Sequence, residues 1–489
     1  MDGNYLKHSI KINYVYKLFY EILSFAAPLI TVPYVSRVLN ADGIGRYSFS
    51  HSLYTYFSLF AVLGTASYGM REVSRCRDDK EKCSKVFWEI EIVSVFTTSI
   101  CIFLWIVFVF WGDLDHLLYM AYIPALVATM LDISWFYMGI EKVMYISIVN
   151  GLFRIVGVFC VFLFVIKAED LYKYVLIQAL TSLGGNALMW IFLPQLITKV
   201  DYKKLVFSCH IVGTLKYFIP AIASSIYTVL DKTLIGVIGN NDFENGYYEQ
   251  ASKIIHIGKV LSFSAFNSVM EARISYLFMH QKIEEIKTRI MDSFDFIMFL
   301  AVGFVCGINA VVTTFVPLFF GAGYEEVIML IIMQSPLVVI VGITNCIGSH
   351  YYTPAGYRVK SAKYLIYGSI VNVFLNIMLI PFWGAKGASV ASVIAEGIIA
   401  TLYIHNCEGF LSIRQAWRSV YKKIIAGMCM IIGVSLYNHF SLLSGTHLLL
   451  TQVLVGALSY FILLILLRDT FIVKILNTVG LVIKHSKRE

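Results

Sequence analysis

Residues 224–252 read SSIYTVLDKTLIGVIGNNDFENGYYEQAS. They begin as an apolar helix long enough to cross a membrane, yet Asp231 and Lys232 stand in its middle. A charge at mid-bilayer costs about 3 kcal/mol on insertion scales, so it normally faces a water-filled cavity or a partner. At helical spacing Lys232 shares a stripe with small and polar residues, namely Ser225, Thr228, Gly236 and Gly239. The pattern predicts a helix that lines a channel or a solute site.

The composition predicts a protein that crosses the membrane many times. Of 489 residues, 58% are hydrophobic and 14% are charged, whereas soluble domains carry about 25% charged residues. The first apolar run contains Pro28 and Pro33 and is followed by many more. We therefore expect a retained first helix and not a cleaved signal peptide.

Apolar runs of about 20 residues predict an all-α polytopic membrane protein with fourteen transmembrane helices. We expect these helices at residues 18–38, 47–67, 87–111, 115–138, 146–166, 172–195, 213–239, 254–278, 293–318, 326–349, 363–382, 387–406, 422–440 and 447–467.

The distribution of basic residues supports this count, because cytoplasmic loops are enriched in Lys and Arg. Most of the 39 Lys and Arg residues fall in alternate loops when the N-terminus is cytoplasmic. An odd number of helices would invert every later loop, so both termini are predicted to be cytoplasmic. The same placement accounts for the net charge of +8, and we expect no nucleic-acid partner.

A weak internal repeat predicts two lobes. Residues 28–52 and 220–252 each read as a proline-started helix, an Asn/Asp/Gly turn and a Gly-Tyr opening of the next helix. The two segments lie six helices apart, which is typical of parallel-repeat transporters. We predict two six-helix lobes around a central cavity and an added C-terminal helix pair. The boundaries are an N-lobe of helices 1–6 at residues 1–197, a cytoplasmic linker at 198–212, a C-lobe of helices 7–12 at 213–410, and helices 13–14 with a cytoplasmic tail at 411–489.

Several kinds of site are not expected. The nine cysteines are scattered, and Cys76 and Cys83 are the only close pair, so we expect no disulfide, no metal site and no cofactor. No GxxxxGK[ST] phosphate loop occurs. All outer loops are short, which disfavours a membrane polysaccharide polymerase or ligase, because such enzymes need a large outer loop.

Basic residues recur in or near the predicted spans. Lysine offers a point charge and arginine a bidentate fork to a phosphate. A cavity with cationic walls would accept an anionic head group such as phosphate or pyrophosphate. The candidate cavity residues are Lys232, Arg154, Arg37, Lys253 and Arg273. Lys253 and Arg273 lie close to helix ends, so snorkelling to the interface is the alternative.

Acidic residues form a second candidate set, for coupling to a cation or for ion pairing. The residues are Asp231, Glu21, Asp132 and Glu396. The alternative is structural: Asp231 pairs with Lys232, or each pairs with a neighbour such as Glu21 or Asp132, only to lower the cost of burial.

The chain resembles the polysaccharide flippases, the Wzx-type translocases of O-antigen or capsule repeat units, in the multidrug/oligosaccharidyl-lipid/polysaccharide exporter superfamily. The motifs that carry this resemblance are PYVSRVLNADGIGRYSFS at 33–50, GTASYGMREVSRCRDDKEKCSKVFWEI at 64–90, YTVLDKTLIGVI at 227–238, NGYYEQASKI at 245–254 and PFWGAKGASVASVIAE at 381–396.

The resemblance implies two six-helix lobes around a V-shaped cavity that opens alternately inward and outward. It implies transport, without enzymatic activity, of an undecaprenyl-pyrophosphate-linked oligosaccharide to the outer leaflet of the bacterial inner membrane. By motif position, Asp231 and Lys232 match the family's pair in helix 7, and Arg71 and Glu72 match the pair after helix 2. Lipid-linked oligosaccharide and membrane lipid are the expected partners, and a monomer is the default. The sequence leaves open whether a polysaccharide polymerase and a chain-length regulator act beside it.

Two other transporters of the same superfamily are rival interpretations. A cation-coupled multidrug exporter would favour twelve helices and an acidic cavity, so Lys232 and Arg154 count against it. A peptidoglycan-precursor flippase also has fourteen helices, but the motifs fit the sugar-repeat branch better.

Overall fold

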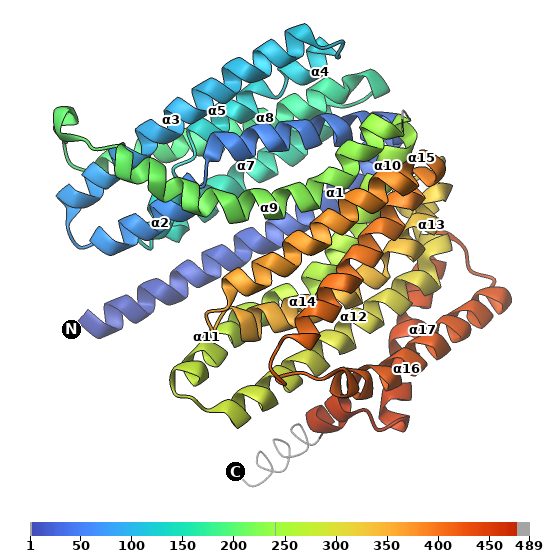
Figure 1. Ribbon diagram of the computed structural model, residues 1–489. Coiled ribbons are helices and arrows are strands. Elements are labelled where there is room, and N and C mark those ends of the chain that lie inside the picture. Colours follow the sequence, from blue (N-terminus) through green and yellow to red (C-terminus); the bar gives the residue numbers. More distant parts are fainter. Residues whose placement is uncertain (1, 240, 477–489) are drawn as a thin grey trace. The chain divides into compact units, whose positions relative to one another are not determined.

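The computed structural model describes residues 2–239 and 241–476, and these two ranges contain helices and no β-strand (Figure 1). Within them, the side chains of residues 2–14, 17–18, 219–221, 223–228, 264–265, 268–269 and 272 lie outside the description. The predicted all-α class is confirmed. The helices form two compact units, Met1–Thr233 and Leu234–Glu489. The lobe boundaries expected from the sequence stay a prediction.

The first unit contains eight helices and most of a ninth. Figure 1 shows α3, α5, α7 and α8 running side by side, and neighbouring members of this set pack together. The bounds are α1 Asp2–Val62, α2 Thr65–Cys76, α3 Lys80–Trp111, α4 His116–Met120, α5 Ile123–Met130, α6 Ser134–Gly139, α7 Val143–Phe164, α8 Leu171–Phe192 and α9 Ser208–Ile238, with short 3-10 turns at Ala168–Asp170, Leu193–Gln195 and Tyr202–Lys204.

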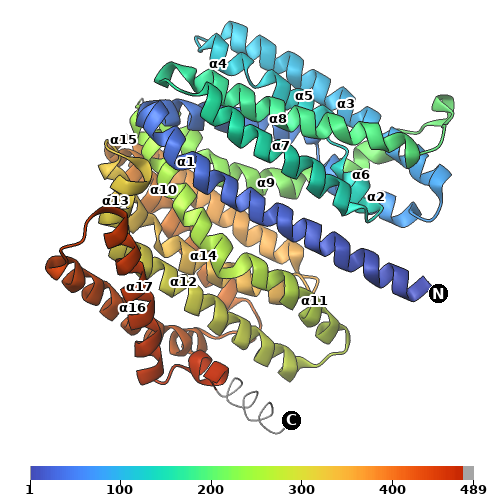
Figure 2. The ribbon, with the colours of Figure 1, turned by 180° about the vertical axis from the view of Figure 1, so that it is seen from behind.

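The second unit contains the remaining helices and two π-helical turns. Figure 2 shows α16 and α17 beside α12, and all three pack on one another. The bounds are α10 Asp242–Lys259, α11 Ala265–Met279, α12 Ile283–Phe320, α13 Glu325–Gln334, α14 Pro336–Ile347, α15 Arg358–His405, α16 Ile413–Phe440 and α17 Gly445–Leu466, with π turns at Val260–Ser264 and Gly348–Tyr352.

Ten helical stretches of the described residues are long and apolar enough to cross a membrane. Two of them each join two helices across a kink. The kink in α1 lies at Asn40 (φ 56°), and the kink in α15 lies at Gly384 (φ 54°). A multi-pass membrane protein is therefore supported, while the count of fourteen spans and the cytoplasmic position of the termini stay predictions.

The predicted span at 115–138 is broken into three short helices, α4, α5 and α6. Pro124 opens α5, and the chain breaks again between Met130 and Ser134. Side chains of α8 satisfy the backbone at this second break, because Asn186 donates to the Ala128 carbonyl at 2.8 Å and Trp190 donates to the Leu131 carbonyl at 2.9 Å. Broken helices persist at membrane depth only where neighbours satisfy the freed groups in this way.

Local capping fixes the start of α3. The Asp79 side chain accepts a hydrogen bond from the backbone N–H of Lys82 at 3.1 Å, which satisfies one free donor of the first turn. This bond, together with the Lys82 ammonium, holds the pKa of Asp79 below its ordinary value. The loop between α2 and α3 is therefore held against the start of a membrane helix.

A close backbone approach joins α9 to the end of α1. Gly64 has a φ of 76°, and a Cβ there would lie 2.7 Å from the Thr214 carbonyl oxygen. Only glycine fits both the left-handed conformation and this contact. Gly64 is the first residue of the motif at 64–90, which begins GTASYG. Its role in the motif is therefore to allow close helix packing.

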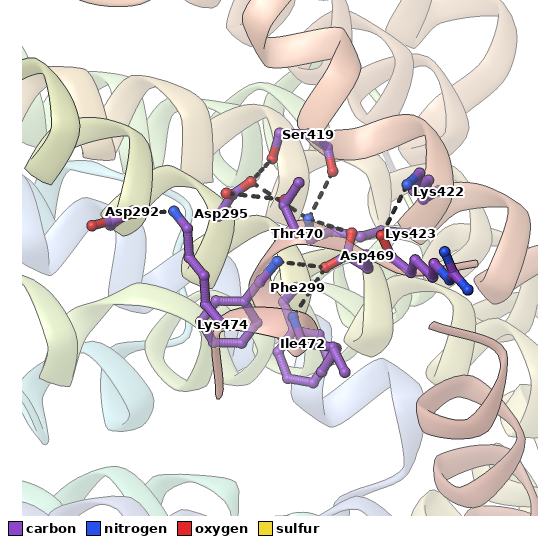
Figure 3. A network of polar contacts seen from close by, with 12 residues as sticks. Asp292, Asp295, Phe299, Ser419, Lys422, Lys423, Asp469, Thr470, Ile472 and Lys474 are labelled. Atoms are coloured by element: carbon purple, nitrogen blue, oxygen red, sulfur yellow. Dashed lines mark hydrogen bonds and ion pairs between the residues drawn. The ribbon is translucent and has the colours of Figure 1, made fainter. Parts of the chain in front are cut away.

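A buried ionic network attaches the C-terminal segment, which begins with Asp469 and Thr470 after α17, to α12 and α16. Figure 3 shows Asp295 and Asp469 converging on Lys423. The Lys423 ammonium lies 3.0 Å from Asp469 and 3.6 Å from Asp295, and its side chain is fully buried. Ser419 donates to Asp295, and Thr470 also donates to it at 3.3 Å. The sequence places Lys423 among the basic residues of a cytoplasmic segment and gives no sign of this burial.

Candidate substrate and ion sites

Asp231 and Lys232 lie in α9, where the helix packs against the second half of α1. Asp231 is buried and Lys232 is half-buried. The next residue, Thr233, donates from its hydroxyl to Ser52 at 3.0 Å and lies 3.1 Å from the Tyr56 hydroxyl. Thr233 is not part of the predicted polar stripe, and the side chains of the stripe residues Ser225 and Thr228 lie outside the description. An ammonium group that has hydroxyl groups nearby can form a charge-assisted hydrogen bond to a phosphate oxygen.

Arg154 and Glu21 are brought to neighbouring helices. Arg154 is exposed on α7, and its guanidinium donates to the Ser24 carbonyl of α1 at 3.4 Å. Glu21 lies one turn before Ser24 and is exposed. Arg37 is also exposed on α1, further along the chain. Three of the candidate charges therefore occupy the α1–α7 pair of the first unit.

Asp132 lies in the break between α5 and α6. Its carboxylate accepts a hydrogen bond from the Ser134 backbone N–H at 2.9 Å, and the side chain is half-buried. It also acts electrostatically on Glu91 of α3, a residue that the sequence analysis does not select. The signal for Glu91 is nevertheless present, because an acidic residue inside the apolar run at 87–111 is a functional candidate by default.

Lys253 and Arg273 lie in the second unit and are not brought together. Lys253 pairs with Glu249 of the same helix at 3.3 Å. Arg273 is exposed and lies 3.6 Å from Glu285 at the start of α12. The twenty residues between them correspond to about 30 Å of helix at 1.5 Å per residue. They therefore lie at opposite ends of the helical stretch from α10 to α11, which the sequence predicts to cross the membrane.

Glu396 lies on a buried polar face of α15, beside Ser389 and Ser392. Gln334 of α13 donates to Ser389 at 3.0 Å, and Asn372 donates to Ser392 at 3.4 Å. The two predicted stripe serines are thus engaged by side chains within the second unit. Buried networks of this kind fix one packing of their helices, because breaking any member leaves an unsatisfied polar group.

The kink of α15 explains the Gly-Ala-Lys-Gly-Ala motif at 384–388. Gly384 has φ 54° and ψ −132°, a combination that residues with a Cβ avoid. The Glu244 carboxylate accepts a hydrogen bond from the Ala385 backbone N–H at 2.7 Å. A Cβ on Gly384 would lie 2.5 Å from that carboxylate. Glu244 belongs to the stretch at 224–252, so residues from two of the sequence motifs come into contact at the kink of α15.

Gly384→Ala is expected to destabilise the protein by about 1–3 kcal/mol, the usual cost of a strained backbone, with the clash against Glu244 added. Thermal unfolding of the detergent-purified protein, followed by tryptophan fluorescence, measures the effect. The matched control is Gly397→Ala in the same helix, where a Cβ would meet nothing within 4 Å. Equal melting temperatures for the two variants would show that the kink does not require glycine.

No group of three or more His, Cys, Asp or Glu side chains within the described ranges is arranged to hold a metal ion. The close cysteine pair has a geometry that the sequence does not predict, since the Sγ atoms of Cys76 and Cys83 lie 3.2 Å apart. Both cysteines are free thiols.

The chain is similar to known proteins over most of its length. The family described as polysaccharide biosynthesis protein matches residues 11–271, more than half of the chain. The chain belongs to this polysaccharide biosynthesis family. The resemblance that the motifs indicate is thereby confirmed at the level of the family.

Two relatives of this polysaccharide biosynthesis family member carry the name "Putative O-antigen transporter". The one from Escherichia coli (strain K12) is 21% identical over 413 residues, which cover 81% of this chain and 96% of the relative. The one from Shigella dysenteriae is 21% identical over 386 residues, which cover 77% of this chain and 94% of the relative.

Solved structures show the same fold. The lipid II flippase MurJ in an inward closed conformation matches with a TM-score of 0.71 at 17% identity, over 94% of this chain and 99% of that one. An inward-facing multidrug resistance MATE transporter of the MOP superfamily matches with a TM-score of 0.55 at 12% identity, over 83% of this chain and 98% of that one. This family member therefore shares its fold with these two transporters.

Proposed function

We propose that the protein is a flippase that moves undecaprenyl-pyrophosphate-linked oligosaccharide repeat units from the cytoplasmic to the outer leaflet of the bacterial inner membrane. The observation that carries this proposal is Lys232, a half-buried lysine beside the buried Asp231 in a helix of a MOP-type fold. Neither a drug cation nor an uncharged solute needs such a residue, whereas a pyrophosphate does.

The proposed cycle uses the charges of both units. Lys232, Arg154 and Arg37 of the first unit bind the pyrophosphate and acidic sugar groups. Lys253 and Arg273 are further candidate anion-binding residues, in the second unit. The lipid tail stays in the bilayer while rocking of the lobes exposes the head group on the other side. Outward movement of an anion is favoured by an inside-negative potential by about 2.3 kcal/mol per charge per 100 mV. Coupling or ion-pair roles fall to Asp231, Glu21, Asp132 and Glu396. The protein acts as a monomer on its lipid-linked substrate.

A second candidate cargo is lipid II, the peptidoglycan precursor. The similarity of the fold to the lipid II flippase MurJ favours it. The two candidates share the need for a cationic site in the membrane, so charge alone does not separate them.

Complementation of two bacterial strains tests the proposal and separates the cargoes. One strain lacks its own repeat-unit flippase, and the other is depleted of its lipid II flippase. We expect the wild-type chain to restore surface polysaccharide on a gel in the first strain and not to restore growth in the second. Restored growth with no polysaccharide would assign the lipid II cargo. If neither is restored at a normal protein level on a blot, transport of purified lipid-linked sugar in vesicles decides, and its absence there overturns the proposal.

A further inference from the structure

Glu91 is a buried acid for which the described residues offer no hydrogen-bond partner. It belongs to α3, within the apolar run predicted to span the membrane, and it is 1% exposed. Neither of its carboxyl oxygens has a hydrogen-bond partner among the residues that the structure describes. Every other candidate charge named above is either more exposed or engaged by an identified or electrostatic contact.

Glu89, two residues earlier on the same helix, provides the contrast. It is 4% exposed, but it accepts a hydrogen bond from the Val206 backbone N–H at 2.8 Å and lies 2.9 Å from the His210 ring. Lys85 lies 3.7 Å from it. These contacts satisfy the hydrogen-bonding capacity of the Glu89 carboxyl group, whereas the described residues offer Glu91 no such contact.

The surroundings of Glu91 hold little that could stabilise a negative charge. Phe87, one turn earlier, stacks on Trp135 of α6 with ring centroids 5.6 Å apart. The Trp135 indole N–H is itself buried with no acceptor in the described part of the chain. Among the elements packed against this part of α3, the break before α6 places Asp132 where its charge acts on Glu91. The helix α9 places His210 against Glu89.

These observations indicate the protonation state of Glu91 when it is buried in this way. An ionised carboxylate buried without a partner is far costlier than the neutral acid, and such groups take up a proton instead. The negative charge of Asp132 raises that cost further. The neutral acid also leaves one hydroxyl donor and one carbonyl acceptor, for which the buried indole N–H of Trp135 is a suitable partner type.

We propose that Glu91 is a proton-binding site of the first unit, and that its proton is released when a rearrangement admits water to the carboxyl group and is taken up again when the group is buried. The release is Glu91–COOH to Glu91–COO⁻ plus H⁺, and the proton passes to the water that the rearrangement admits. Because the proton binds one arrangement and not the other, it shifts the balance between them. Its role in driving transport rests on the proposed flippase function.

Infrared spectroscopy of the purified protein tests the site without any transport. At neutral pH we expect the wild type to show the C=O stretching band of a buried carboxylic acid, and Glu91→Gln to lack it. Glu89→Gln is the matched control, since it removes a buried but partnered glutamate from the same helix and should keep the band. A wild-type spectrum without the band, or a band that survives in Glu91→Gln, overturns the proposal.

The pH dependence of flipping in vesicles tests the coupling. The wild-type rate is expected to change by up to about tenfold per pH unit, the limit for one proton, and Glu91→Gln should be insensitive to pH. Asp132→Asn removes a repulsive charge, so it should move the wild-type profile to lower pH. An unchanged profile in Glu91→Gln overturns the coupling. If the wild type moves no lipid-linked sugar at any pH, the flippase proposal has failed, and the infrared result alone decides the proton site.

Discussion

Replacing Lys232 with Glu is expected to abolish surface polysaccharide in the complemented strain, while the protein level on a blot stays near that of the wild type. The change places two acidic residues side by side at positions 231 and 232, and the site that should attract a pyrophosphate then repels it. Loss of a hydrogen bond to a charged group costs about 1.5–3 kcal/mol, and the reversed charge adds repulsion. The expected reduction in flipping of purified lipid-linked sugar in vesicles is therefore at least tenfold.

Three further variants show whether the charge of Lys232 or its packing matters. Lys232→Arg keeps the charge and should retain partial transport, whereas Lys232→Gln keeps a polar side chain of slightly shorter length without the charge and should transport poorly. Lys203→Glu reverses an exposed lysine in the segment before α9 and should behave as the wild type. Normal polysaccharide in cells that express Lys232→Glu would remove Lys232 from the substrate site and leave the family assignment untouched.

Lys423→Ala is expected to lower the stability of the second unit by about 3–5 kcal/mol, the cost of removing one partner from a buried ion pair. The Lys423 side chain is fully buried, and Asp469 and Asp295 are 1% and 3% exposed. Without the ammonium both carboxylates remain buried next to one another. Thermal unfolding in detergent measures the loss, and limited proteolysis after α17 should show the C-terminal segment released first.

The control for Lys423 is a nearby pair on the surface. Lys474 lies 2.6 Å from Asp292, and their side chains are 59% and 37% exposed. Lys474→Ala should cost no more than about 1 kcal/mol, as is usual for exposed pairs. A triple variant that carries Lys423→Met with Asp295→Asn and Asp469→Asn should recover much of the stability, since no charge is then left unpaired. If Lys423→Ala unfolds at the same temperature as the wild type, the network does not anchor the segment.

Two breaks in the helices correspond to motifs in the sequence. The Asn/Asp/Gly turn expected after the first proline-started helix appears as the kink at Asn40. Glycine at 384 could be predicted as a break, but its partner could not, since Glu244 lies far away in the sequence and reaches it only through packing. The candidate charges were likewise found as residues in apolar runs, while their partners came from the fold: Ser24 for Arg154, Glu249 for Lys253 and Glu285 for Arg273.

The sequence by itself determined the all-α membrane class and the family, because lipid imposes a strong requirement on the length and polarity of each span. It also identified the acidic and basic residues inside apolar runs. Only the tertiary structure decided what each of these residues does. Glu89 and Glu91 are equivalent in the sequence, yet one meets Val206 and His210 and the other meets no partner among the described residues. Hydropathy is a property of a segment, whereas the state of a buried charge depends on atoms that other helices bring within about 4 Å of it.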